Sequence, residues 1–118
     1  TWGAMVPVAL DGAAELTREG TEVEVIDLRT LLPMDEETVL ESVRKTSKAL
    51  VLHEESRTLG VGAEVAALLA EKAFEWLDAP VVRVTAPDAP VPFAPALEAA
   101  YLPGPATLLA AARKLAAY

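Results

Sequence analysis

The stretch Val25-Ile26-Asp27-Leu28-Arg29-Thr30-Leu31-Leu32-Pro33-Met34-Asp35 decides the fold of this chain. It starts with apolar, β-branched residues and continues into the polar residues Asp27 and Arg29. Such a run is typical of a buried strand that ends in a polar loop, where open α/β sheets place their binding sites. Asp35 is a favourable N-cap, so we expect a helix to begin there.

Strands and helices are predicted to alternate along the rest of the chain. Apolar runs predict strands, and apolar residues at helical spacing predict helices between them. The expected strands cover residues 22–28, 49–52 and 81–84, and the expected helices cover residues 5–19, 35–45, 62–77 and 106–117. Residues 1–4 resemble the end of a further strand, which right-handed crossovers would make a central one. The alternation predicts an α/β fold with three layers, in which a mostly parallel sheet has helices on both faces.

Proline is concentrated near the C-terminal end of the sequence. Seven of the nine prolines lie between Pro80 and Pro105. Proline removes a backbone donor and interrupts both helices and strands, so residues 86–104 are expected to lack regular structure. A loop of this length in a compact domain is usually functional or lies at an interface.

Composition excludes several classes of protein. A chain of 118 residues with 53% hydrophobic residues forms one domain, here residues 1–118, and is too apolar to be disordered. No apolar run approaches the roughly 18 residues of a membrane span, and no signal peptide is visible. The absence of cysteine suits a cytoplasmic protein. Since the chain begins without Met, we expect it to be part of a longer polypeptide.

The net charge points to the kind of partner. Ten basic and 18 acidic residues give a formal charge of −8. This charge argues against nucleic acid or an anionic membrane as a partner, because both carry negative charge themselves. A basic protein surface suits it better.

His53, the one histidine, follows a predicted strand and precedes Glu54 and Glu55. A histidine oriented by Glu54 suits general acid–base chemistry. However, the chain has no cysteine and no second histidine to complete a nucleophile pair or a metal site. We therefore interpret His53 and Glu54 as residues that contact an interface or support a neighbouring site, and we predict no catalytic or metal-binding residue in this domain.

Gly60-Val61-Gly62 opens the third predicted helix in the manner of a phosphate-binding turn. The dinucleotide fingerprint needs a third glycine, but position 65 is Val65, and no Gly-Lys-Ser or Gly-Lys-Thr occurs. The glycines are better explained by a tight turn between strand and helix. An independent ligand-binding α/β domain that uses His53 and this turn stays open as an alternative.

Several blocks of sequence, taken in order, resemble one known family: the C-terminal domain of the β subunit of thiamine-diphosphate-dependent 2-oxo acid dehydrogenases. The blocks are Val25 to Pro33, His53-Glu54, Gly60 with Gly62-Ala63-Glu64, Leu77-Asp78-Ala79-Pro80, Arg83-Val84, Asp88-Ala89-Pro90 with Pro92-Phe93, and Tyr101-Leu102-Pro103. Each block is short, but their order covers essentially the whole chain. Transketolase and deoxyxylulose-phosphate synthase contain a similar domain, so the corresponding domain of such an enzyme is a second alternative.

The resemblance implies a role in assembly. In the family this domain has a transketolase C-terminal-like fold, and thiamine diphosphate and magnesium bind to other domains of the parent enzyme. The implied partners are a second β subunit, the α subunit of an α2β2 enzyme, and the lipoyl acyltransferase core, which binds through a small basic domain. Asp78 and the carboxylate of Tyr118 match the positions expected to contact that basic domain. Branched-chain and pyruvate dehydrogenases share these blocks, so the 2-oxo acid is left open.

The sequence departs from the family pattern at three positions in one loop. Glu55-Ser56 stands where relatives often have Ala-Pro, and Leu59 stands where glycine is common. The loop over residues 55–60 is therefore expected to differ in shape.

Overall fold

The computed structural model describes all residues, 1–118, and its centre is a parallel pair of strands. The strands are β1 (Leu50–Ser56) and β2 (Val82–Ala86), joined through helix α3 (Val61–Lys72) and a short 3-10 helix, η1 (Phe74–Trp76). Leu50 lies opposite Val82 and Leu52 opposite Val84, with an irregularity in the register before Ser56. Parallel strands need such a crossover connection, and the pairing confirms the parallel sheet expected from the sequence.

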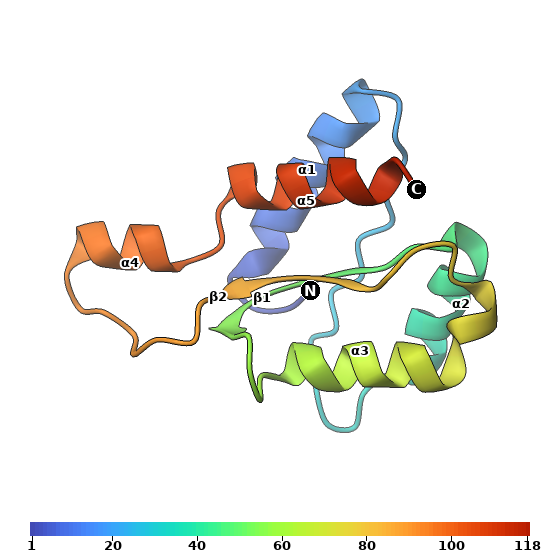
Figure 1. The fold of residues 1–118 in the computed structure, drawn as a ribbon, viewed down its shortest axis with the longest axis horizontal. Coiled ribbons are helices and arrows are strands. Elements are labelled where there is room, and N and C mark those ends of the chain that lie inside the picture. The colour runs from blue at the N-terminus through green and yellow to red at the C-terminus, as the bar shows by residue number, and fades with distance from the viewer.

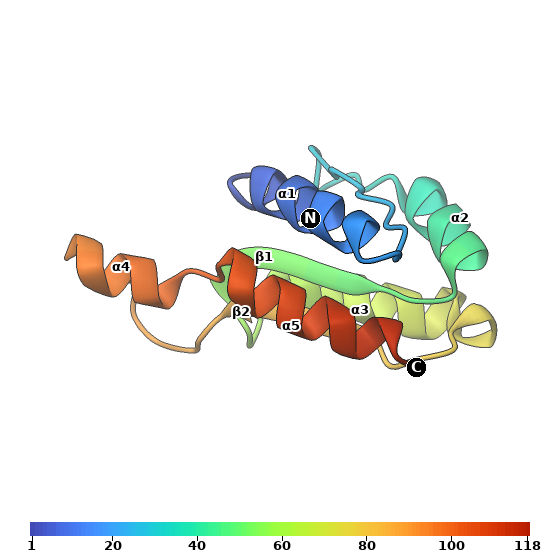
Figure 2. The ribbon, with the colours of Figure 1, turned by 90° about the horizontal axis from the view of Figure 1, so that it is seen from above.

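Helices cover both faces of this sheet (Figures 1 and 2). Helix α1 (Met5–Arg18) packs with helix α5 (Pro105–Ala116) on one face, while α3 and helix α2 (Glu36–Thr46) lie on the other. The structure therefore confirms the three-layer α/β/α arrangement. No helix is both long and apolar enough to cross a membrane.

Each layer interface has its own apolar core. The core between β1, α2 and α3 consists of Val39, Val43, Val51, Val65, Leu69 and Ala73. The core on the opposite face consists of Met5, Leu52, Val84 and Leu108. Val51 and Leu52 contribute to different cores because successive side chains of a strand point to opposite faces.

Helix α2 begins where the sequence predicts it. The Asp35 carboxylate accepts a hydrogen bond from the Thr38 N–H at 3.1 Å, and Glu36 follows in the positively polarised first turn. The helix ends at Thr46, and the following residue, Ser47, has a φ of 59°, the left-handed conformation common after a helix. Asp35 is thus confirmed as the N-cap.

The strand predicted over residues 22–28 is absent, although the segment is extended. Its backbone makes only two hydrogen bonds to Thr1: the Thr1 amino group donates to Ile26 C=O at 3.0 Å, and Leu28 N–H donates to Thr1 C=O at 3.0 Å. Residues 1–4 likewise form no strand: residues 1 and 2 have no regular structure and residues 3 and 4 form a turn. A strand exists only with a hydrogen-bonded partner along its length, and the backbone of residues 22–25 makes no hydrogen bond to another backbone segment.

The proline-rich region contains a helix that the sequence analysis excluded. Helix α4 (Pro95–Tyr101) projects from the body of the domain (Figure 1). Pro95 occupies the first turn, where its missing N–H costs no hydrogen bond. The expectation that residues 86–104 lack regular structure was therefore wrong: the prolines set where the helix begins and ends. The helix predicted over residues 62–77 is also divided, since α3 stops at Lys72 and η1 follows.

Candidate functional site

His53 lies near the C-terminal end of β1 and is completely buried. Its ring stacks on the indole of Trp2, with 5.0 Å between ring centroids and 10° between the planes. Neither ring nitrogen has a hydrogen-bond partner. A side chain enclosed in this way contacts no solvent, so it is not available to exchange protons with a substrate in this structure.

Burial also sets the charge of His53. It lowers the pKa of His53 below its usual value, because the buried imidazolium loses its hydration. The Glu55 carboxylate acts in the opposite direction, but its oxygen lies 3.9 Å from Nδ1, beyond hydrogen-bond distance. Arg83 and the Thr1 amino group lower the pKa further. His53 is therefore the neutral imidazole at neutral pH.

The two glycines predicted to form a turn lie directly against His53. A Cβ on Gly62 would overlap His53 Nε2, and a Cβ on Gly60 would lie 2.5 Å from the Ser56 carbonyl oxygen. Both positions therefore need glycine for close packing. In addition, the Glu55 carboxylate accepts a hydrogen bond from Val61 N–H at 2.8 Å. A carboxylate of the chain itself thus occupies the helix N-terminus that a phosphate would need, which argues against a phosphate-binding turn.

The loop after β1 is held to the loop after β2. Asp88 accepts hydrogen bonds from the backbone N–H and the hydroxyl of Thr58, at 2.8 and 2.7 Å. These bonds lower the pKa of Asp88 below its usual range. Arg57 and Arg83 donate to each other's carbonyl oxygens at 3.2 and 2.9 Å.

Leu59, in the loop after β1, adopts a φ of 62° and is almost fully exposed. A residue with a Cβ is disfavoured in that conformation, so Leu59 holds it at a cost in strain.

Asp78 and Tyr118 are both exposed. They lie at the same end of the domain, because the consecutive residues Ser47 and Lys48 contact the two segments that carry them. Asp78 N–H donates to the Ser47 carbonyl at 2.9 Å. Lys48 Nζ donates to the carbonyl of Ala116, at the end of α5, at 3.3 Å. Glu54 is also exposed and lies on β1. The roles predicted for Asp78, Tyr118, His53 and Glu54 stay predictions.

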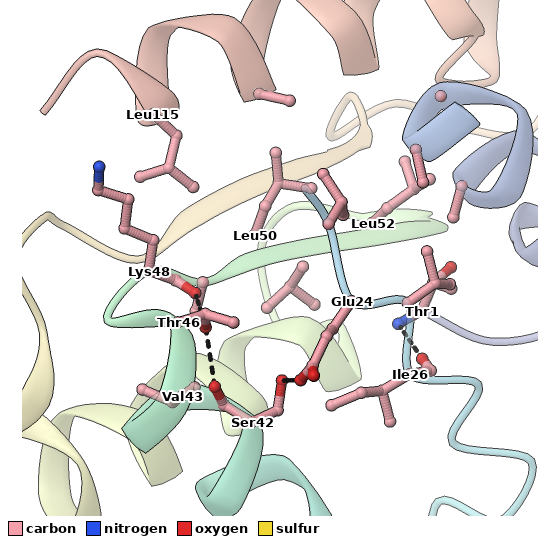
Figure 3. A pocket seen from close by; sticks show the side chains of 18 of the residues that line it. Thr1, Glu24, Ile26, Ser42, Val43, Thr46, Lys48, Leu50, Leu52 and Leu115 are labelled. Carbon is pink, nitrogen blue, oxygen red and sulfur yellow. Dashed lines mark hydrogen bonds between the residues drawn. The ribbon is translucent and has the colours of Figure 1, made fainter. Parts of the chain in front are cut away.

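An apolar cavity that no sequence pattern indicated lies inside the domain (Figure 3). It has a volume of about 260 Å³ and lies among α1, α2, α5, β1 and the extended segment 22–28. Thr1 and Ile26 meet at one side, and Lys48 and Leu115 lie toward the other. The sequence feature connected with this cavity is the strand predicted over residues 22–28, because residues of that segment line it.

Comparison with known proteins gives a consistent family. Residues 1–108 match the family described as Transketolase, C-terminal domain. The chain is 46% identical over 115 residues to the β subunit of 2-oxoisovalerate dehydrogenase from Pseudomonas aeruginosa, covering 98% of the chain and 31% of the relative. It is 44% identical over 115 residues to the pyruvate dehydrogenase E1 component subunit beta of Bacillus subtilis, covering 98% of the chain and 35% of the relative.

Two further similarities extend this result. The β subunit of acetoin:2,6-dichlorophenolindophenol oxidoreductase from Cupriavidus necator is 46% identical over 114 residues, covering 97% of the chain and 34% of the relative. A solved structure described as a split gene transketolase, inactive beta4 tetramer, superposes with a TM-score of 0.80 at 33% identity, covering 97% of this chain and 36% of that one. The chain thus spans about one third of the length of the curated relatives it matches. The match over residues 1–108, the curated relatives and the shared fold together show that the chain belongs to the transketolase C-terminal domain family, in the branch found in β subunits of 2-oxo acid dehydrogenases.

Proposed function

We propose that this chain is the C-terminal assembly domain of the β subunit of a thiamine-diphosphate-dependent 2-oxo acid dehydrogenase. The observation that carries the proposal is the identity of 44–46% over nearly the whole chain to β subunits of pyruvate and 2-oxoisovalerate dehydrogenases. The named relatives act on different compounds, so the parent substrate is proposed only as pyruvate, a branched-chain 2-oxo acid or a related compound.

The parent enzyme would bind thiamine diphosphate and magnesium outside this domain. No group of three or more His, Asp or Glu side chains comes together to suit a metal ion. A diphosphate at the N-terminus of α3 would meet the Glu55 carboxylate, which already accepts the Val61 N–H. The residues present therefore do not fit the cofactor, and we assign this domain no step of the decarboxylation.

An exposed apolar arm supports a role in assembly. The arm, residues 87–104, includes α4 and extends away from the core (Figures 1 and 2). Phe93 is fully exposed, and Val91 and Leu97 are 63% and 60% exposed. Clustered exposed apolar side chains on a protrusion are typical of a surface covered by another protein. We propose a second β subunit as the protein that covers it, consistent with the β4 assembly named for the structural relative.

The opposite end of the domain suits the acyltransferase core. Asp78 is exposed there, and the chain ends at Tyr118 close to the Lys48–Ala116 contact. The formal charge of −8 favours a basic partner such as the acyltransferase's subunit-binding domain. The α subunit completes the proposed α2β2 enzyme.

An activity assay of the assembled enzyme tests the proposal. The complete polypeptide that carries this chain is produced with its α subunit, and reduction of an artificial electron acceptor is followed with pyruvate, 2-oxoisovalerate or acetoin. We expect turnover of at least one compound that depends on thiamine diphosphate and magnesium. Failure of the polypeptide to bind an α subunit, together with no turnover of any of the three, would contradict the proposal.

The alternative of an independent ligand-binding domain has less support. His53, its central residue, is enclosed by Trp2 and Gly62, and Glu55 already occupies the turn at Gly60. A transketolase or deoxyxylulose-phosphate synthase parent is separated from our proposal by the same assay, because those enzymes transfer or condense carbon fragments without reducing an acceptor.

A further inference from the structure

The apolar arm, residues 87–104, leaves the domain with little packing along its length. Residues 87–91 and 93–100 are exposed, and helix α4 contains no buried residue. Figures 1 and 2 show the arm and α4 extending away from the other helices and the strands. The direction of the arm is therefore set by contacts at its two ends and not by packing between them.

The first end of the arm is joined to the loop after β1. Asp88 accepts hydrogen bonds from the N–H and the hydroxyl of Thr58, at 2.8 and 2.7 Å, so each carboxylate oxygen has one donor. Two directional bonds to one carboxylate fix its orientation as well as its position, whereas one bond leaves it free to rotate. At the second end Pro103 is buried, and Gly104 C=O accepts a hydrogen bond from Leu108 N–H in α5.

Thr58 itself has a fixed position. Its carbonyl oxygen accepts a hydrogen bond from the Ser56 hydroxyl at 3.1 Å. Arg57, the preceding residue, is tied to β2 by the two hydrogen bonds that it exchanges with Arg83. The following residue, Leu59, keeps a φ of 62°, and such backbone strain persists only where the surrounding structure maintains it. The loop thus presents both donors of Thr58 to the arm from a rigid base.

The arm is stiff between Asp88 and its exposed aromatic residue, Phe93. Four prolines lie within residues 87–95, and each fixes its own φ. Because a proline-rich segment extends by about 3.1 Å per residue, Phe93 lies up to roughly 15 Å from Asp88. A rotation of about 20° at Asp88 would then move Phe93 by about 5 Å, which is more than a close-packed interface tolerates.

We propose that Thr58 and Asp88 are positioning residues for assembly: their paired hydrogen bonds aim the arm so that Phe93 meets the second β subunit. The inference rests on the proposed function, in which this arm joins β subunits. It adds that the affinity between β subunits depends on two residues that need not contact the partner. Without their bonds the arm stays apolar and exposed but samples several directions, and binding then has to order it at a cost in affinity.

Sedimentation of the complete polypeptide over a concentration series measures the dissociation constant of the β subunits. Thr58→Val removes the hydroxyl donor with little change in shape, and we expect about 10-fold weaker association. Thr58→Ser keeps the hydroxyl and should restore the affinity to within about 2-fold. Thr17→Val is the matched control, because Thr17 is exposed on α1.

A double-mutant cycle separates positioning from other effects. Asp88→Ala removes both acceptors, so we expect about 30-fold weaker association. In that background Thr58→Val should have no further effect, because the partner of the hydroxyl is gone. The amide of Thr58 should exchange about 10-fold faster in Asp88→Ala, while the core amide of Leu69 stays protected in every variant.

Three results would overturn the inference and leave the proposed function in place. The first is unchanged association in Thr58→Val and Asp88→Ala while Phe93→Asp still separates the subunits. The second is additivity of the two substitutions, which would show that Thr58 and Asp88 act separately. The third is weaker association together with loss of Leu69 protection, which would show general destabilisation.

Failure of the proposed assembly surface has a different signature. Association that survives Phe93→Asp rejects the arm as the surface that joins β subunits, and the inference about Thr58 and Asp88 is then overturned as well. If Asp88→Ala does not fold, the comparison of Thr58→Val with Thr58→Ser still decides between the outcomes.

Discussion

The ring of His53 fills the space that a side chain on Gly62 would take. A Cβ at Gly62 would overlap His53 Nε2, and the stack on Trp2 limits how far the ring can move away. We expect Gly62→Ala to lower the free energy of unfolding by about 1–3 kcal/mol, the usual cost of overpacking a core. Urea unfolding measures this change. Gly104→Ala is the matched control, because no atom lies within 4 Å of the added methyl group.

The cost of Gly62→Ala should depend on His53. In a His53→Ala background the added methyl meets no ring, so the same substitution should cost at least about 0.5 kcal/mol less than in the unaltered chain. Additive effects of the two substitutions in urea unfolding would show that His53 and Gly62 are not in contact as described.

Stability should fall as the pH is lowered through the range in which His53 titrates. Burial lowers the pKa of His53 in the folded state, so the unfolded chain binds a proton at a higher pH than the folded chain does. The free energy of unfolding is then highest above about pH 6.5 and decreases as the pH falls from there toward the folded pKa. Thermal unfolding at pH 7.5 and 5.5 measures this loss. His53→Gln should flatten the profile over that interval, and an unchanged slope in His53→Gln would mean that another group is responsible.

Leu59→Gly should stabilise the domain. The φ of 62° places Leu59 in the left-handed region, where a residue with a Cβ is disfavoured by about 1–2 kcal/mol. Glycine removes that strain but also gains freedom in the unfolded chain, so we expect a net gain of up to about 1 kcal/mol in chemical denaturation. Phe93→Gly, at an equally exposed position with negative φ, should instead leave stability unchanged or lower it. If both substitutions lower stability alike, the loop does not hold Leu59 in this conformation.

Docking of the acyltransferase should depend on Asp78 and the C-terminal carboxylate. Exposed ion pairs contribute about 0–1 kcal/mol, whereas truncating one partner of a desolvated interfacial pair costs roughly 2–5 kcal/mol. We therefore expect Asp78→Ala, or one residue added after Tyr118, to weaken binding of the basic subunit-binding domain by at least about 30-fold. Glu71→Ala is the control and should change affinity much less. Calorimetry at low and high salt measures these effects, and affinity should fall as salt rises.

Should the basic domain bind equally well to Asp78→Ala and to the extended C-terminus at low salt, the contact lies on another surface. In that case the assignment of these two residues is wrong even though the assembly role stands.

The parts of the fold that depend on local signals could be predicted from the sequence. The N-cap at Asp35 and the apolar periodicity of α2 and α5 depend on neighbouring residues, and the structure has these helices where they were expected within one or two residues. The strand at residues 22–28 could not be predicted correctly, because strand formation needs a partner that this segment meets only at Thr1. Helix α4 was missed because proline at a first turn favours a helix start instead of preventing it.

At the candidate site around His53, local features could likewise be predicted from the sequence, whereas contacts between distant residues could not. The glycines at positions 60 and 62 signalled a tight turn, and the structure adds what they approach: the Ser56 carbonyl and the His53 ring. Burial of His53 depends on Trp2, which lies far away in the sequence, so no local pattern revealed it. The link that brings Asp78 and Tyr118 to one end through Ser47 and Lys48 is likewise a tertiary contact.

The molecular mass of the complete polypeptide tests the assembly role most directly. Phe93, fully exposed on the apolar arm, is replaced by Asp, and Leu10, 54% exposed on α1, is replaced by Asp as the control. A charge buried in an apolar interface is strongly destabilising, so light scattering should show β subunits that associate in the unaltered protein and in Leu10→Asp but are monomeric in Phe93→Asp. Association that is unchanged in Phe93→Asp would contradict the assignment of residues 87–104 as the surface that joins β subunits.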